Sequence, residues 1–136
     1  MIDIAILGSS KPALEYAHTI LDKTPSARVT IYTEDAEVGF PEVLISEELV
    51  LSEELDSIPS NWYGSIPEGI DRNTPSTSAN SWLSKSMAIG LASRGGRFLL
   101  RTIVLNIDED RREISFRGGG RVRSGVESYD ELQDFR

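Results

Sequence analysis

The sequence predicts an α/β fold: a β-α-β unit with a central parallel sheet, followed by a β-hairpin or meander, in three layers. Residues 3–7 are apolar at nearly every position, as in a strand buried on both faces. Residues 12–23 carry apolar side chains at helical spacing, and residues 28–33 are rich in β-branched side chains. With 136 residues, the chain is expected to form one domain over residues 1–136.

Local signals delimit the β-α-β unit. Pro12 suits the first turn of the helix, where a missing N–H costs nothing, and Ser9 or Ser10 is expected to cap it. Residues 24–26, Thr-Pro-Ser, end the helix. The unit fills about 32 residues, the usual size of a βαβ crossover. Because such crossovers are right-handed, the turn at residues 8–10 is expected at the carboxyl edge of the sheet.

Residues 34–80 form a long insert after the second strand. Within it, residues 46–58 (SEELVLSEELDSI) predict a short acidic amphipathic helix with Ser46 and Ser52 as N-caps. Residues 59–80 are rich in Pro, Ser, Thr, Asn and Gly, and a connection this long is usually functional or partly disordered. The acidic residues lack the spacing of a calcium loop, so we expect a solvated helix face and no metal site.

The rest of the chain predicts one more helix and a hairpin. The helix is expected over residues 81–94, with Gly95–Gly96 as its C-cap. Residues 97–108 predict a strand, residues 109–112 a turn, and residues 113–119 the hairpin partner.

Residues 118–125 (GGGRVRSG) predict a glycine-rich turn or bulge, and residues 126–135 a weak final strand or turn. Glycine-rich backbone can form anion-binding nests, and Arg117, Arg121 and Arg123 lie in or beside it. With Arg94 and Arg97, these arginines are the candidates for binding phosphate. We favour solvated arginines on a bulged hairpin, because charged runs usually face water.

Three ring-bearing side chains are candidates for ligand contacts. Trp62 and Tyr63 lie in a polar loop and are expected to anchor that loop; the alternative is stacking on a flat ligand. His18 lies among apolar neighbours on the first helix, and we expect a surface or satisfied core position there because nothing supplies a catalytic partner.

The turn after the first strand has the Rossmann-like pattern of a dinucleotide site, G-x-G-x-x-G. Gly8, Ser10 and Ala13 occupy its three key positions, with Ser9 and Lys11 completing the candidate cofactor-binding turn. Gly8 can make the turn and Ala13 allows close helix packing, but Ser10 narrows the space through which a pyrophosphate approaches. Either the turn binds a dinucleotide, or Ser10 merely caps the helix.

A ribose-binding acid is expected at the end of the second strand, about 20 residues or slightly more after the first glycine. Glu34 follows Gly8 by 26 residues, and Asp35 is the adjacent candidate. If Thr33 holds that exact position instead, the predicted site is weaker, because threonine has no carboxylate. The alternative is that both acids are solvated loop residues.

Composition narrows the remaining functions. The net charge of −8 argues against binding nucleic acid or an anionic membrane. The absence of cysteine and the single histidine exclude disulfides, thiolate catalysis and multi-histidine metal sites. No signal-peptide pattern or long apolar run is present, so a cytoplasmic location is expected. No nucleophile–base pair or carboxylate pair stands out, so no catalytic residue is assigned.

Three stretches carry a family resemblance: IAILGSSKPALEYA, VTIYTEDAEVGFP and SWLSKSMAIGLASRGGRFLLRTIVLNIDED. Their order resembles the N-terminal FAD-binding part of glutathione-reductase-like oxidoreductases, especially the geranylgeranyl reductase, lycopene cyclase and aromatic hydroxylase branch. Gly39 and Pro41 match the G-x-P of that branch, and YDELQDF resembles the strand before its second FAD motif. The resemblance covers nearly the whole chain in outline, with degenerate motifs.

The resemblance implies FAD as the cofactor, in a domain or subunit related to flavoprotein oxidoreductases that is not a complete enzyme alone. Any redox chemistry would belong to the bound cofactor. The alternative is a degenerate domain without cofactor that acts as a structural or protein-interaction module, and a third reading is an NAD(P)- or mononucleotide-binding protein. The expected partners are another protein chain or a second copy of this one.

Overall fold

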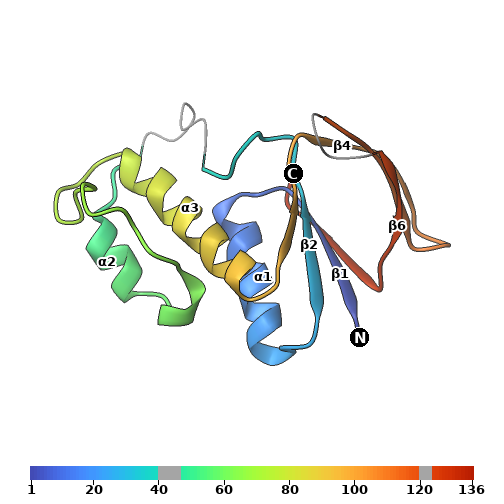
Figure 1. Cartoon of the computed structure of the whole chain (residues 1–136), viewed down its shortest axis with the longest axis horizontal. Helices are drawn as coiled ribbons and strands as arrows, with labels where there is room; N and C mark the ends of the chain where they lie inside the picture. The colour runs from blue at the N-terminus through green and yellow to red at the C-terminus, as the bar shows by residue number, and fades with distance from the viewer. Residues whose placement is uncertain (40–46, 120–123) are drawn as a thin grey trace.

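The computed structural model describes residues 1–39, 47–119 and 124–136. A parallel sheet forms the middle layer, with helices on one face and an antiparallel sheet on the other (Figure 1). The predicted three-layer α/β class is therefore confirmed. The predictions that concern Pro41, Ser46, Arg121 and Arg123 lie outside the described residues.

The parallel sheet has the strand order β3-β2-β1-β7. Its strands, all paired in parallel, are β1 (Asp3–Leu7), β2 (Arg28–Tyr32), β3 (Arg97–Leu99) and β7 (Glu131–Asp134). The predicted first and second strands are confirmed, the second ending one residue early. Because β1 is buried and has a neighbour on each side, its nearly continuous apolar sequence is explained.

The helical layer contains α1 (Lys11–Lys23), α2 (Leu51–Asp56), the 3-10 turn η1 (Ser60–Trp62) and α3 (Ser78–Ser93). Its apolar side chains pack on the sheet face formed by Ile4, Ile6, Val29 and Ile31. The predicted helices at 12–23 and 81–94 are confirmed, although α3 begins three residues earlier, at Ser78 rather than Ser81. Its C-cap is also confirmed, since Gly96 N–H donates to Leu91 O over 2.9 Å.

The acidic helix is shorter than predicted. It spans only α2, and its N-cap position is Val50, with no side-chain cap. Ser52, predicted as an N-cap, lies inside the helix instead. Its backbone N–H donates to Arg72 O over 2.8 Å, so the long insert itself satisfies a group that a cap normally serves.

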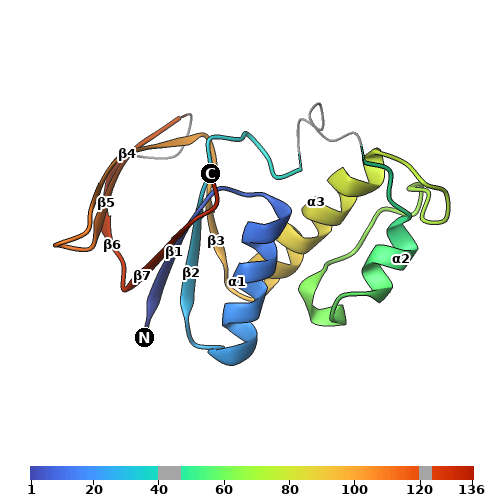
Figure 2. The same ribbon diagram turned by 180° about the vertical axis from the view of Figure 1, so that it is seen from behind.

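The antiparallel layer consists of β4 (Thr102–Asp108), β5 (Glu113–Gly118) and β6 (Gly125–Ser128), in that order. The hairpin between the first two is confirmed. The prediction of one strand over 97–108 is wrong, because the chain changes sheets at Arg101, whose φ is 49°. The prediction for 126–135 also merged two strands, since the chain moves there from β6 to β7 (Figure 2).

A histidine-centred cluster joins α1, α3 and η1. His18 is fully buried; its Nε2 donates to Met87 O over 2.9 Å, and its Nδ1 accepts from Arg94 Nη1 over 2.9 Å. Its ring stacks on Trp62, whose indole N–H donates to Asp22 over 2.8 Å. The predictions of a satisfied core histidine and of a tryptophan that anchors its own loop both fit this geometry.

The cluster predicts acid-sensitive stability. Burial is the largest cause that lowers the pKa of His18 from its usual 6.5, and Arg94 lowers it further. Because the unfolded chain then binds the proton more readily, we expect stability to fall as the pH drops below about 6.5. His18 is the only histidine, so unfolding midpoints at pH 7.5 and pH 5.5 isolate its contribution from the carboxyl groups, which titrate lower.

The matched variant is His18→Gln, whose amide can still donate to Met87 O but does not titrate. We expect its unfolding midpoint to change less than that of the native protein across this pH interval. An equal pH dependence in both proteins would exclude the histidine as its source.

Candidate functional site

A cavity of about 730 Å³ opens at the carboxyl edge of the parallel sheet. It lies where β1 and β2 end and α1 begins, and the first turns of α3 form another wall. Of the seven residues predicted to bind a cofactor, six line it: Gly8, Ser9, Ser10, Lys11, Glu34 and Asp35. Such a volume falls within the range of small-molecule sites, roughly 300–1,000 Å³.

Ala13, the seventh predicted residue, does not line the cavity. It is fully buried within the core between α1 and the sheet. That is the position where the fingerprint needs a small residue for close helix–strand packing.

Gly8 makes the sharp turn between β1 and α1. Its φ of 102° lies in a region that side-chain-bearing residues rarely adopt. Its N–H donates to Tyr32 O over 2.8 Å, which ties the turn to β2. A Cβ at this position would be in ordinary contact with the backbone of Phe135, at 3.4 Å, so the turn depends on glycine for its conformation.

The amino end of α1 points into the cavity without a side-chain cap. Ser10 occupies the N-cap position in an extended conformation, but it makes no capping hydrogen bond, so the predicted serine cap is not formed. Pro12 carries no N–H, but the other backbone N–H groups of the first turn, with the partial positive charge of the helix dipole, remain available to an anion. Lys11 lies beside them, with its Nζ 3.6 Å from Glu54.

Ser9, the residue before Ser10, links the glycine turn to the end of β2. Ser9 is buried, and its hydroxyl lies 3.1 Å from Thr33 Oγ1 and 3.0 Å from Asp35 Oδ2. These bonds connect the glycine turn to the end of β2. Glu34 is exposed and makes no side-chain hydrogen bond to another described residue. Asp35 is therefore the candidate acid held against the turn.

The bend in the chain at Arg101, just before β4, holds the loop that carries Asp35 in place. Arg101 N–H donates to Asp35 O over 2.9 Å, and Thr102 N–H donates to Thr33 O over 2.8 Å. These bonds are possible because the chain turns out of the parallel sheet at Arg101. The unpredicted break between β3 and β4 thus positions one of the predicted site residues.

Several further cavity residues were not among the predicted site residues. They come from the end of β2, from α3, from β4, from the segment after β7 and from positions 39 and 47: Tyr32, Thr33, Gly39, Glu47, Asn80, Ser81, Ser84, Thr102, Val104, Phe135 and Arg136. Asn80, Ser81 and Ser84 carried a usable signal, since residues three and four positions apart on a helix place these polar groups on one side of the first turns of α3. The residues after β7 reach the cavity only through long-range strand pairing.

Arg136, a cation at the cavity, forms an ion pair with Asp134, two positions earlier in the chain. Arg136 donates to both carboxylate oxygens of Asp134, over 3.0 Å or less. The hydrogen bonds from Arg136 are the main reason that the pKa of Asp134 lies below its usual range. Glu34 also raises the pKa of Arg136, after the larger effect of Asp134. The mouth of the cavity therefore carries both signs of charge.

Within residues 1–39, 47–119 and 124–136, no helix combines the length and apolar character that a membrane crossing requires. The same residues contain no group of three or more histidine, aspartate or glutamate side chains placed to hold a metal ion.

Sequence comparisons identify no relative: no protein-family model matches the chain, and no curated protein matches it. Structural comparison finds proteins with a similar fold. A geranylgeranyl bacteriochlorophyll reductase-like protein from Thermoplasma acidophilum matches 97% of this chain with a TM-score of 0.67 at 13% identity. The water-forming NADH oxidase from Lactobacillus brevis, solved with NADH, matches 98% with a TM-score of 0.60 at 18% identity.

The flavin-dependent halogenase CmlS matches 96% of the chain with a TM-score of 0.61 at 19% identity. The chain spans only 38%, 24% and 28% of the lengths of these three proteins, respectively. At such identities the likeness concerns the fold. The chain thus has the FAD-binding-domain-like fold found in the N-terminal part of flavoprotein oxidoreductases.

Proposed function

We propose that this chain binds FAD in the cavity at the carboxyl edge of its parallel sheet. The observation that carries the proposal is the uncapped amino end of α1, which meets the cavity directly behind the left-handed turn at Gly8. A diphosphate is the ligand group that such a helix end favours. No side chain of residues 1–39, 47–119 or 124–136 fills the cavity, which leaves space for a ligand among them.

The residues present fit the cofactor. The backbone of residues 8–10 and the first turn of α1 would hold the diphosphate, and Asp35 would accept hydrogen bonds from ribose hydroxyls. Only Oδ2 of this carboxylate is engaged by Ser9 and Thr33, which leaves Oδ1 for a ligand. FAD, when bound, supplies hydride and electron transfer. The chain's own residues would bind and orient it.

We further propose that a turnover-competent site needs additional polypeptide, from another chain or from a second copy of this one. The matched flavoproteins are longer than this chain, which spans 24–38% of the three described above. A ligand in a cavity open at the sheet edge remains accessible to such a partner.

The test is a titration of the purified protein with FAD, in which binding is measured by the quenching of flavin fluorescence and by thermal shift. Saturable binding is expected, with NADH and NADPH binding more weakly. Ser10→Gly restores the missing second glycine, so we expect it to tighten FAD binding by about tenfold, or roughly 1.4 kcal/mol. Ser65→Gly, at an exposed position away from the cavity, is the control and should leave the affinity unchanged.

A cofactor-free interaction module is the competing function. It is favoured by Ser10 at the second glycine position and by the internal hydrogen bonds of Asp35. If neither the native protein nor Ser10→Gly binds FAD, NADH or NADPH, this alternative replaces the proposal.

A further inference from the structure

The face of the parallel sheet that meets the antiparallel layer is polar at one end. Alternation along β2 places Arg28, Thr30 and Tyr32 on this face. Apolar side chains of β5 cover the part near Tyr32, where Ile114 and Phe116 pack. The part near Arg28 and Thr30 is left open, at the opposite end of the strands from the FAD cavity.

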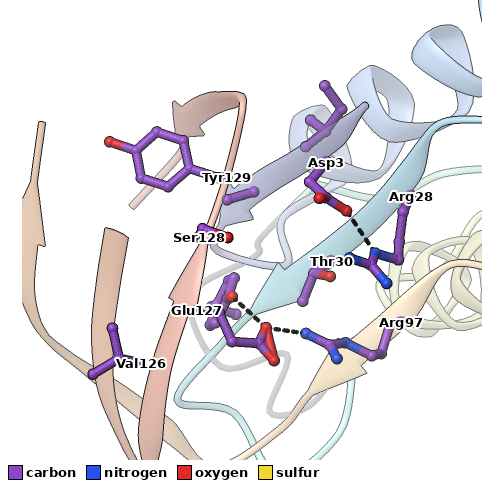
Figure 3. Close-up of a pocket in the computed structure, with 11 residues that line it drawn as sticks. Asp3, Arg28, Thr30, Arg97, Val126, Glu127, Ser128 and Tyr129 are labelled. Carbon is purple, nitrogen blue, oxygen red and sulfur yellow. Dashed lines mark hydrogen bonds and ion pairs between the residues drawn. The ribbon is translucent and has the colours of Figure 1, made fainter. Parts of the chain in front are cut away.

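A second cavity of about 340 Å³ occupies this open part (Figure 3). The sheet forms its floor, and residues 126–129 at the end of β6 form its wall. Its volume is at the lower end of the range for small-molecule sites, about 300–1,000 Å³. Among the described residues, Tyr32 is the only one that lines both cavities.

Two ion pairs border this cavity from different strands. Arg28 Nε lies 2.5 Å from Asp3 Oδ1, and Arg97 pairs with Glu127. Figure 3 shows the two pairs on either side of the space above Thr30. The positive and negative charges balance, so the cavity has no preference for a ligand with a large net charge.

Each pair retains hydrogen-bonding capacity. Arg28 engages only its Nε among the described residues, so the two Nη groups remain available to a carboxylate. Glu127 Oε2 accepts from Arg97 and from the Tyr32 hydroxyl, at 3.1 Å from the latter, while Oε1 is not engaged. The hydrogen bond from Arg28 holds the pKa of Asp3 below its usual range, which keeps that pair charged.

Thr30 adds a polar group to the floor of this cavity. The residue is 6% exposed, and its hydroxyl makes no hydrogen bond to another described residue. Figure 3 shows this hydroxyl directed into the space between the ion pairs. Among the described residues no buried side-chain polar atom lacks a partner, so this hydroxyl reaches solvent through the cavity and is free to bond to a ligand. Its neighbour in register on β1 is Ala5, a small residue that leaves the space open.

We propose that this cavity binds a small zwitterion of the α-amino-acid class. The ligand carboxylate contacts the two Nη groups of Arg28 and the Thr30 hydroxyl. The ligand ammonium contacts Oε1 of Glu127. A zwitterion satisfies both signs of charge without disturbing the balance of the two ion pairs. This proposal does not rest on FAD binding, since Arg28, Thr30 and Glu127 do not line the other cavity.

The test uses ¹⁵N-labelled full-length protein titrated with L-alanine, acetate and ethylamine, while backbone amide shifts are recorded. L-alanine is expected to cause saturable shifts around Thr30 and Glu127. Acetate and ethylamine, which each carry one of its charges, are expected to bind at least about tenfold more weakly, a difference of roughly 1.4 kcal/mol. Equal binding of acetate, or no saturable shift with L-alanine, overturns the proposal.

Two variants separate ligand contact from a structural role. Thr30→Val removes the hydroxyl at nearly constant shape, so without ligand the unfolding midpoint should stay the same or rise. Its dissociation constant for L-alanine should increase about five- to tenfold, as expected for one lost hydrogen bond. Arg28→Lys, which removes the planar fork, should weaken binding similarly, whereas Arg111→Lys in an exposed turn should not. Unchanged affinity in both cavity variants contradicts the assignment.

Discussion

Gly90→Ala is expected to destabilise the protein strongly, although alanine is normally the better helix former by about 1 kcal/mol. Gly90 lies inside α3 and is buried. A Cβ at this position would be 2.4 Å from Trp62 O and 2.9 Å from Tyr63 Cα. Both are backbone atoms, so relief requires the loop and the helix to separate.

The contact that would be lost is extensive. Next to Gly90, Gly64 N–H donates to Ser86 O over 2.9 Å, and the Ser86 hydroxyl donates to Gly64 O over 2.8 Å. Trp62 in turn anchors the histidine cluster. Overpacking of this kind typically costs about 1–3 kcal/mol, so the variant should unfold several degrees below the native protein.

Thermal unfolding followed by circular dichroism measures the effect. Gly69→Ala is the matched control, since no atom lies within 4 Å of its added Cβ, and it should unfold near the native temperature. A Gly90→Ala protein as stable as the native one would mean that the helix and the 62–64 segment are not in close contact.

The second large effect is expected from Gly8→Ala, which acts on stability and on binding. Forcing alanine to a φ of 102° costs about 1–3 kcal/mol, although its methyl group would be in ordinary contact with the backbone of Phe135. Relief of this backbone strain moves the turn, and with it the amino end of α1. Under the proposed function, FAD affinity should fall by more than about tenfold.

A second glycine separates the two contributions. Gly95 has a comparable φ of 92°, but it lies after α3, away from the cavity, and its added Cβ would have no neighbour within 4 Å. Gly95→Ala should therefore lose stability through strain while retaining FAD affinity. If both variants bind FAD as the native protein does, the turn at Gly8 is not part of the binding site. Thermal unfolding and flavin fluorescence provide the two measurements.

The sequence signals were strongest where a structure depends on nearby residues. The strand, turn and helix of residues 3–23 follow from apolar spacing, Gly8 and Pro12, and the structure reproduces them almost residue for residue. The same holds for the hairpin of β4 and β5.

Predictions failed where the determinant was a distant contact. Nothing local to Arg101 indicates a positive φ, since arginine rarely adopts one, so β3 and β4 were predicted as one strand. Ser10 stands at the N-cap position as expected, yet no capping bond forms. The choice of Asp35 over Glu34 as the acid held by the turn depends on Ser9, whose partners lie 24 and 26 residues away.

The pairing of β1 with β7 has a consequence for biosynthesis. During synthesis β1 emerges from the ribosome long before β7, its neighbour at residues 131–134, since Asp3 and Asp130 are 127 positions apart. Until that segment appears, a nascent chain exposes one edge of its most hydrophobic strand. Such an edge invites pairing with other chains, so translation intermediates and fragments cut before residue 131 should depend on chaperones to avoid aggregation.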